Sequence, residues 1–197
     1  ELPSSIGKNP SLQEFAVSDC PVERIPDSFG ENCKIQILRF SQIPFTELPP
    51  SLQNLKNISQ LYLDTCENLA EISVIGKLRN LAILRLSYLP DLTQLGFSFH
   101  QLMMLKELRI DNLPKMNALP DFGMENKNLV RIQLETLPKL KALPESIQHC
   151  SGLEFFNLNN LGIEKVSGSL ELLSSLKTLR ITNCKDLKYI PSRILKI

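Results

Sequence analysis

A pattern of apolar residues recurs along the whole chain with a period of 23 or 24 residues. Each repeat begins with an apolar residue, and two more apolar residues follow three and five positions later. The repeats begin at Leu12, Ile35, Ile58, Leu81, Leu105, Leu129, Leu153 and Leu176. Self-similarity at a fixed period of this length is the signature of a repeat protein, in which each unit stacks only on its neighbours. This period constrains the fold more than any other feature of the chain.

The apolar spacing inside one repeat fits neither a single helix nor a single strand. In residues 176–191 the apolar positions are separated by 3, 2, 3, 3 and 3 residues. A half-buried strand would alternate strictly, and a helix face would follow a period of 3.6. We interpret the start of each repeat as a short strand, which turns through a narrow apolar arc and returns along the outside of a coil. Because no coil can bury its apolar residues alone, the coils must stack on one continuous core.

The repeat L-x-x-L-x-L-x-x-[C/L]-x-x-L-x-x-[L/I]-P resembles the leucine-rich repeat, and the resemblance covers essentially the whole chain. A closing Leu-Pro or Ile-Pro pair occurs at 2–3, 25–26, 48–49, 119–120, 143–144 and 190–191. The resemblance implies a single leucine-rich-repeat domain over residues 1–197, of the α/β repeat class. We expect a solenoid with a parallel concave sheet of about eight short strands.

Two departures from the commonest leucine-rich repeat are visible. The Asn that normally bonds to the backbone of the turn is replaced by Cys, Leu or Ile in all eight repeats. The turns must therefore satisfy their backbone groups through neighbouring backbone or through water, and the sequence leaves both open. The outer segments lack helical caps and long helical runs, which favours an irregular or short-helical convex side, with Pro at the first position of short helices.

Among leucine-rich repeats, "LxIxxCxxLxxIP" and "LPKLKALPESI" look most like the carboxy-terminal sensor region of plant intracellular nucleotide-binding immune receptors. They look almost equally like the repeat domains of bacterial effectors injected into host cells, some of which carry a separate ubiquitin-ligase domain. The resemblance implies protein–protein recognition on the concave face, in plant defense, innate immunity or another host–pathogen contact. The alternative is a substrate-targeting domain of an effector ubiquitin ligase whose catalytic domain lies outside the chain. A structural spacer is a third hypothesis.

Composition and motifs disfavour several other functions. The chain is 43% hydrophobic and 22% charged, which is typical of a folded protein, and its 22 basic and 21 acidic side chains nearly cancel. That balance disfavours a nucleic-acid partner. The chain contains no stretch of about 18 apolar residues, so we expect no membrane insertion. The first ten residues lack the pattern of a signal peptide. No phosphate loop, nucleophile elbow or paired-carboxylate motif is present, so we expect neither an enzyme nor a cofactor.

The cysteines indicate a reducing compartment. Cys20, Cys66 and Cys184 occupy a position where other repeats carry Leu or Ile, and Cys150 occupies a second apolar position, so we predict all four as small core residues. The sequence does not assign Cys33. Five cysteines without a Cys-x-x-Cys motif suit an intracellular, cytoplasmic protein, in the host cytoplasm if the chain is a secreted effector. We expect the two histidines, at positions 100 and 149, to lie at the surface of the outer segments.

Residues between the inward apolar positions face the opposite side of each strand, so they form columns on the concave face. The central column contains four arginines, and Arg and Tyr are the residues most enriched at binding hot spots. The candidate partner-binding residues are Ile37, Arg39, Tyr62, Asp64, Ile83, Arg85, Tyr88, Arg109, Asp111, Arg131, Glu135 and Phe155. The alternative is that arginines beside acidic residues only balance charge on a solvated sheet, and that single exposed apolar residues such as Ile37 and Phe155 contact no partner.

Both ends of the chain cut through repeats. Residues 1–7 resemble the end of a coil, and the chain stops just after the Ile-Pro pair at 190–191. No polar cap is visible at either end, although a solenoid needs caps to cover its terminal core. We therefore expect a fragment of a longer protein, or ends that pack against flanking domains or a second copy.

Overall fold

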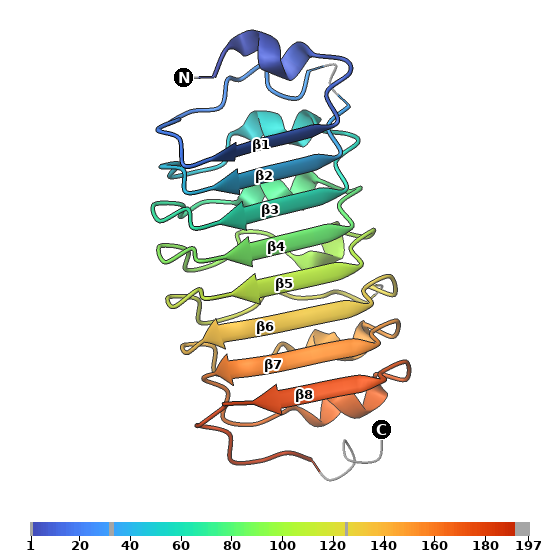
Figure 1. Ribbon diagram of the computed structural model, residues 1–197. Coiled ribbons are helices and arrows are strands. Elements are labelled where there is room, and N and C mark those ends of the chain that lie inside the picture. Colours follow the sequence, from blue (N-terminus) through green and yellow to red (C-terminus); the bar gives the residue numbers. More distant parts are fainter. Residues whose placement is uncertain (1, 32–33, 125, 192–197) are drawn as a thin grey trace.

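Eight short parallel strands form one sheet that runs the length of the molecule (Figure 1). The computed structural model describes residues 2–31, 34–124 and 126–191. The strands follow chain order in the sheet, and each pairs with the next. They are β1 (Glu14–Ser18), β2 (Ile37–Ser41), β3 (Gln60–Asp64), β4 (Ile83–Ser87), β5 (Glu107–Asp111), β6 (Arg131–Leu137), β7 (Phe155–Leu161) and β8 (Thr178–Thr182). The predicted solenoid with about eight short strands is confirmed.

The pairing register places equivalent residues of successive repeats side by side. Leu61 of β3 lies beside Leu84 of β4, which lies beside Leu108 of β5. Each of these leucines is fully buried. In the strands from β2 to β5 the buried residues alternate with half-buried or exposed ones. The strands therefore bury one side of the sheet, and the other side, here called the concave face, remains open to solvent.

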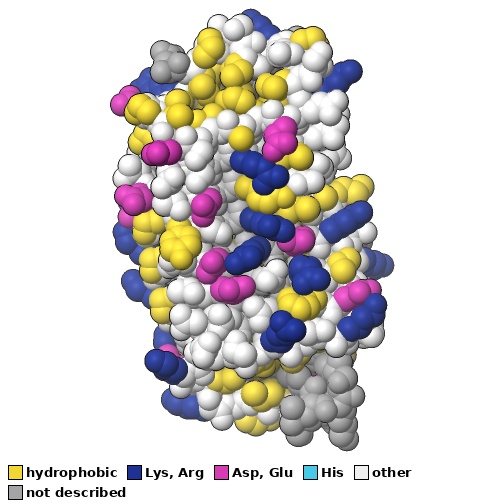
Figure 2. Space-filling model, viewed as in Figure 1, with side chains coloured by type: hydrophobic (Ala, Val, Ile, Leu, Met, Phe, Trp, Pro, Cys, Tyr) yellow, Lys and Arg dark blue, Asp and Glu magenta, His cyan; other side chains and the backbone are white. Residues whose placement is uncertain are grey.

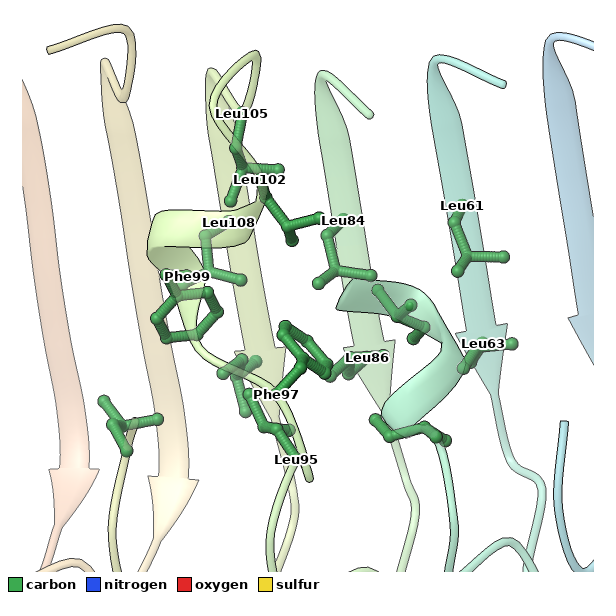
Figure 3. Packing of buried hydrophobic residues seen from close by; sticks show 14 of the residues in the cluster. Leu61, Leu63, Leu84, Leu86, Leu95, Phe97, Phe99, Leu102, Leu105 and Leu108 are labelled. Carbon is green, nitrogen blue, oxygen red and sulfur yellow. The ribbon is translucent and has the colours of Figure 1, made fainter. Parts of the chain in front are cut away.

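A single hydrophobic core runs between the strands and the outer segments. Figure 3 shows Leu84, Leu86 and Leu108 from the strands facing Leu102, Phe97 and Phe99 from an outer segment. Phe99 stacks on Phe122 of the next coil, with ring centroids 4.6 Å apart. Each coil thus covers the apolar side of its neighbour, as stacking of repeats requires.

The convex side carries short 3-10 helices, as predicted. They are η1 (Ser4–Lys8), η2 (Pro50–Asn54), η3 (Ser73–Lys77), η4 (Phe99–Gln101), η5 (Glu145–His149) and η6 (Gly168–Leu172). Between β5 and β6 the described residues form no helix.

Two details of the predicted convex helices are wrong. Pro occupies the first helical position in η2, but at η5 the corresponding proline, Pro144, is the N-cap residue. Caps are also present: the Ser167 hydroxyl accepts a hydrogen bond from the Ser169 N–H in η6, and the Ser98 N–H donates to Gln101 Oε1 at η4.

Neighbouring backbone satisfies the turn after each strand from β1 to β5, and two cysteine thiols add to it. Cys20 Sγ donates to the Ser18 carbonyl oxygen at 3.1 Å, and Cys66 Sγ donates to that of Asp64 at 3.4 Å. The first residue of each of these turns donates its N–H to a carbonyl oxygen of the next strand at 3.0 Å, as Tyr88 does to Asp111. The equivalent residue of every repeat has a positive φ. These residues are Asp19, Gln42, Thr65, Tyr88, Asn112, Thr136, Asn160 and Asn183. The missing Asn is therefore replaced by main-chain hydrogen bonds between coils.

The predicted burial of the cysteines is confirmed in the middle of the solenoid and wrong at its ends. Cys66 and Cys150 are buried, and burial raises the pKa of the Cys150 thiol to about 12. Cys20 is exposed and Cys184 is half-buried. Cys20 lies in the turn after β1 and Cys184 in the turn after β8, the terminal strands of the sheet, so within the described residues no further coil covers these thiols. Cys33 lies outside the described residues, as do residues 192–197, part of the predicted carboxy-terminal contact surface.

Candidate functional site

All twelve candidate residues are at least partly exposed, and eleven of them lie on the strands of the concave face. Arg39, Tyr62, Arg85 and Arg109 are consecutive in one column, because the register pairs each with the next. Figure 2 shows basic and acidic side chains interspersed with apolar ones across the middle of this face. The sequence therefore predicts this column correctly, since a period of two fixes which side of a strand each residue faces.

Tyr62 lies between two arginines at the centre of this column. The Arg39 guanidinium carbon lies 3.9 Å from the centroid of the Tyr62 ring, and that of Arg85 lies 5.4 Å away. The Tyr62 hydroxyl donates a hydrogen bond to Gln60 Oε1 at 2.7 Å. Cation–π attraction on one ring and this hydrogen bond hold the side chains in a fixed arrangement.

Carboxylates fix the outer ends of the same two arginines. Arg39 Nε lies 3.0 Å from Glu14 Oε1, and this hydrogen bond raises the pKa of Arg39 above its ordinary value. Arg85 donates to Glu107 Oε1 from Nη2 at 2.7 Å and from Nε at 3.2 Å. Both carboxylates belong to the column that precedes the arginines along the strands, and neither was among the predicted site residues. A diagonal pairing of acidic and basic columns on neighbouring strands is the sequence signal that would have indicated them.

Arg109 belongs to a looser cluster of charges. Its Nη2 atom lies 3.8 Å from Asp111 Oδ2 and 4.0 Å from Glu135 Oε1. Its Nε atom is buried and has no hydrogen-bond partner among the described residues. Burial, together with the negative charges of Glu135 and Asp64, raises the pKa of the Asp111 carboxyl above its usual range. This cluster has more unsatisfied charge and hydrogen-bonding capacity than the Tyr62 stack.

A second aromatic–arginine group lies at β6 to β8. The guanidinium carbon of Arg131 lies 4.2 Å from the centroid of the Phe155 ring, and that of Arg180 lies 5.6 Å away. Arg180 stands in the central column but was not among the predicted site residues. Phe155, an apolar residue in a polar column, is thus half-buried under guanidinium groups.

The remaining candidate residues stand apart from these three groups. Ile37 and Ile83 lie in the first column, on either side of Gln60. Asp64 is exposed and accepts a hydrogen bond of 3.4 Å from the Ser41 hydroxyl. Tyr88 lies one residue beyond β4 with φ of 53°, at the carboxyl edge of the sheet, and is 52% exposed.

The described residues contain neither a metal-ligand cluster nor a membrane-spanning helix. No described group of three or more His, Cys, Asp and Glu side chains is arranged to hold a metal ion. No helix in the described ranges is long and apolar enough to cross a membrane.

Comparison with solved structures identifies the architecture. A leucine-rich-repeat protein of Leptospira interrogans superimposes with a TM-score of 0.77 and 23% sequence identity over 99% of this chain. The leucine-rich-repeat domain of the type III effector XopL superimposes with a TM-score of 0.71 and 21% identity over 94% of the chain. The fold is a leucine-rich-repeat solenoid. The chain spans only 55% and 66% of the lengths of these two structures, respectively.

Comparisons of sequence give no match, either with protein-family models or with curated proteins. At this level of identity, the two superpositions establish the leucine-rich-repeat fold and do not transfer a partner. The concave face of the solenoid itself is therefore where a function must be sought.

Proposed function

We propose that this leucine-rich-repeat solenoid is a protein-recognition module that binds a protein partner on its concave face. The observation that carries the proposal is the exposed stack of Arg39, Tyr62 and Arg85. Arg and Tyr are the residues most enriched at binding hot spots. Because ring contacts and carboxylates already hold these side chains, little side-chain entropy remains to be lost when a partner binds.

Charge balance on a solvated sheet is a weaker account of this arrangement. An exposed ion pair typically stabilises a protein by less than about 1 kcal/mol, so stability alone gives little reason to fix arginines in this way. The cluster around Arg109 adds a buried donor without a partner and a carboxyl group whose pKa is raised. The Asp111 carboxyl would gain from a partner that supplies a positive charge.

We place this recognition inside a cell, at a host–pathogen contact or in innate immunity. The repeat motifs resemble plant intracellular immune receptors and bacterial effectors, and one of the similar solved structures is the repeat domain of a type III effector. The four described cysteines carry free thiols, in keeping with a reducing compartment. The alternative is the substrate-targeting domain of an effector ubiquitin ligase. The full-length open reading frame separates the two, because only the alternative requires a catalytic domain.

The test is capture of partners by the immobilised full-length protein from a host-cell lysate, quantified by mass spectrometry. Tyr62→Ala, Arg85→Ala and Arg109→Ala are compared with Lys115→Ala, which removes an exposed ion pair with Asp91 outside the concave face. We expect loss of a central residue to weaken capture by roughly thirtyfold, as hot-spot residues do, with the melting temperature nearly unchanged. Capture that is unaltered in all three concave variants would place the binding site elsewhere.

A further inference from the structure

The convex side has a cavity beside the outer segment between β5 and β6. Among the described outer segments from β2 to β8, this is the one without a helix. This segment, between β5 and β6, packs beside η4, and a cavity of about 420 Å³ lies between them. Its lining residues are His100, Met103, Gly123, Met124 and Asn126. A volume of this size is typical of small-molecule sites, which are concave and mostly apolar with a few polar groups.

Two methionines supply an apolar wall that is open to solvent. Met103 is 57% exposed and Met124 is 74% exposed. Thioether sulfur makes favourable contacts with aromatic rings, and flexible methionine side chains adapt to the shape of a ligand. The carbonyl oxygens of Phe99 and Phe122 accept hydrogen bonds from the lining residue Asn126, and their two buried rings form a stacked pair in the core.

Gly123 allows the two segments to approach closely enough to form the cavity. It has φ of 75°, and a Cβ atom added there would lie 2.4 Å from His100 Cβ. The Cβ atom of His100 therefore packs against the backbone of the next outer segment at Gly123.

A hydrogen-bond chain fixes the tautomer of His100. The Ser98 hydroxyl donates its proton to the Asp121 carbonyl oxygen at 2.6 Å, so its oxygen is an acceptor toward His100 Nδ1, 2.7 Å away. Nδ1 of neutral His100 then carries the proton, and Nε2 carries a lone pair. Nε2 has no partner among the described residues, so it is an acceptor available at the cavity.

Asn126 forms a buried part of the cavity wall. The side chain is 3% exposed, and its Nδ2 donates to the carbonyl oxygens of Phe99 at 3.2 Å and Phe122 at 3.4 Å. Its buried Oδ1 has no partner within the described ranges. This oxygen has almost no exposed surface, so Asn126 shapes the cavity wall and leaves His100 Nε2 as the acceptor that a ligand can reach.

We propose that this cavity is a binding site for a small aromatic molecule that carries an N–H or O–H donor. The ring lies between the Met103 and Met124 side chains, and the donor is directed to Nε2 of His100. This site is independent of the concave face, since its lining residues belong to the outer segments of the solenoid.

Methionine-methyl NMR tests the proposal, because the chain has four methionines and two of them line the cavity. The probe is indole, titrated into protein labelled with ¹³C at the methionine methyl groups. We expect the Met103 and Met124 signals to shift with a dissociation constant on the order of millimolar, as for a fragment-sized ligand. Met104, exposed but outside the cavity lining, and the buried Met116 are internal controls whose signals should not move. The absence of shifts at Met103 and Met124, or equal shifts at Met104, would overturn the proposal.

A matched ligand tests the donor. 1-Methylindole keeps the ring but lacks the N–H, so we expect it to bind roughly three- to tenfold more weakly, the usual effect of one hydrogen bond. His100→Phe should weaken indole by the same factor and leave 1-methylindole unchanged, because that variant removes the acceptor and retains a flat ring. Equal binding of the two ligands by the unaltered protein would refute the assigned role of His100, whatever the variant does.

Discussion

The turn after each strand uses one residue with a positive φ, and it does so with residues as different as Asp19, Thr65 and Tyr88. A positive φ is unfavourable for most side chains, so stacking must compensate for the strain. The compensation is visible in the N–H group of each of these three residues, which bonds to the next strand at 3.0 Å. Contacts between coils therefore override the local preference of single residues.

A glycine in the β7 turn provides the sharpest single-residue test. A Cβ atom at Gly162 would lie 2.0 Å from the Pro138 carbonyl oxygen, which belongs to the neighbouring coil and cannot turn away. We expect Gly162→Ala to destabilise the protein by about 1–3 kcal/mol, the usual cost of overpacking. Gly168→Ala is the matched control, because nothing lies within 4 Å of its added Cβ. Urea unfolding measures both, and equal stability of the two variants would contradict the close approach of the coils.

Asp111 provides a pH-dependent test. Its pKa is raised in the folded protein by burial and by the charges of Glu135 and Asp64, so folding favours the protonated carboxyl. The charged form therefore reduces stability at neutral pH, and this cost disappears as the pH falls through the folded pKa. We expect Asp111→Asn to stabilise the protein at pH 7 by at most about 1 kcal/mol and to have no effect near pH 3.

The control for this measurement is Asp91→Asn, which removes an exposed ion pair with Lys115. It should leave stability unchanged or lower it slightly at pH 7. A stabilisation by Asp111→Asn that persists unchanged in acid would show that the charge of Asp111 is not its cause.

At the scale of elements, each repeat combines a regular strand with a variable outer segment. The strands could be predicted because leucine positions recur in all eight repeats and the period of two then fixes the columns. The hydrogen bond from the Ser169 N–H to the Ser167 hydroxyl could not be predicted, because it depends on the backbone conformation at the start of η6. The columns indicate Glu107 as a diagonal neighbour of Arg85, but the sequence does not fix the arginine rotamer, so it does not show which neighbour Arg85 contacts. The cavity was missed because it forms where a helix is absent.

A hydroxyl in one outer segment connects two successive coils. The Ser98 hydroxyl donates to the Asp121 carbonyl oxygen and lies 2.7 Å from His100 Nδ1. We expect Ser98→Ala to lower the free energy of unfolding by about 1 kcal/mol, because it removes two side-chain hydrogen bonds, although the Asp121 carbonyl oxygen still accepts the Phe99 N–H at 3.0 Å. Ser174→Ala is the comparison, since Ser174 is exposed and makes no side-chain hydrogen bond within the described residues. A chemical denaturation series in which both variants behave alike would argue against this connection.

At the scale of the whole molecule, the core is one continuous column of aliphatic and aromatic side chains. The stability of the core therefore depends on each coil being covered by a neighbouring coil on both sides. Where the sheet ends this cover is missing, and Cys20 is exposed and Cys184 half-buried. The same stack leaves the concave face free, because its residues contribute little to the core.

Truncation of one central leucine tests this division. Leu84 is fully buried between Leu61 and Leu108, so we expect Leu84→Ala to cost about 2–5 kcal/mol. Leu172 is 55% exposed on the convex side, and its replacement by Ala should change stability by less than about 0.5 kcal/mol. Thermal unfolding followed by circular dichroism gives both values. A small effect at Leu84 would mean that the coils do not share one core.

Carboxyl footprinting of the protein, alone and bound to a captured partner, tests the central claim most directly, because it reports which face the partner covers. The proposed interface predicts that labelling of Asp64, Asp111 and Glu135 falls several-fold on binding, while labelling of Asp91 and Asp186 stays the same. Protection confined to Asp91 and Asp186, with the three concave carboxylates labelled as in the free protein, would contradict recognition by the concave face.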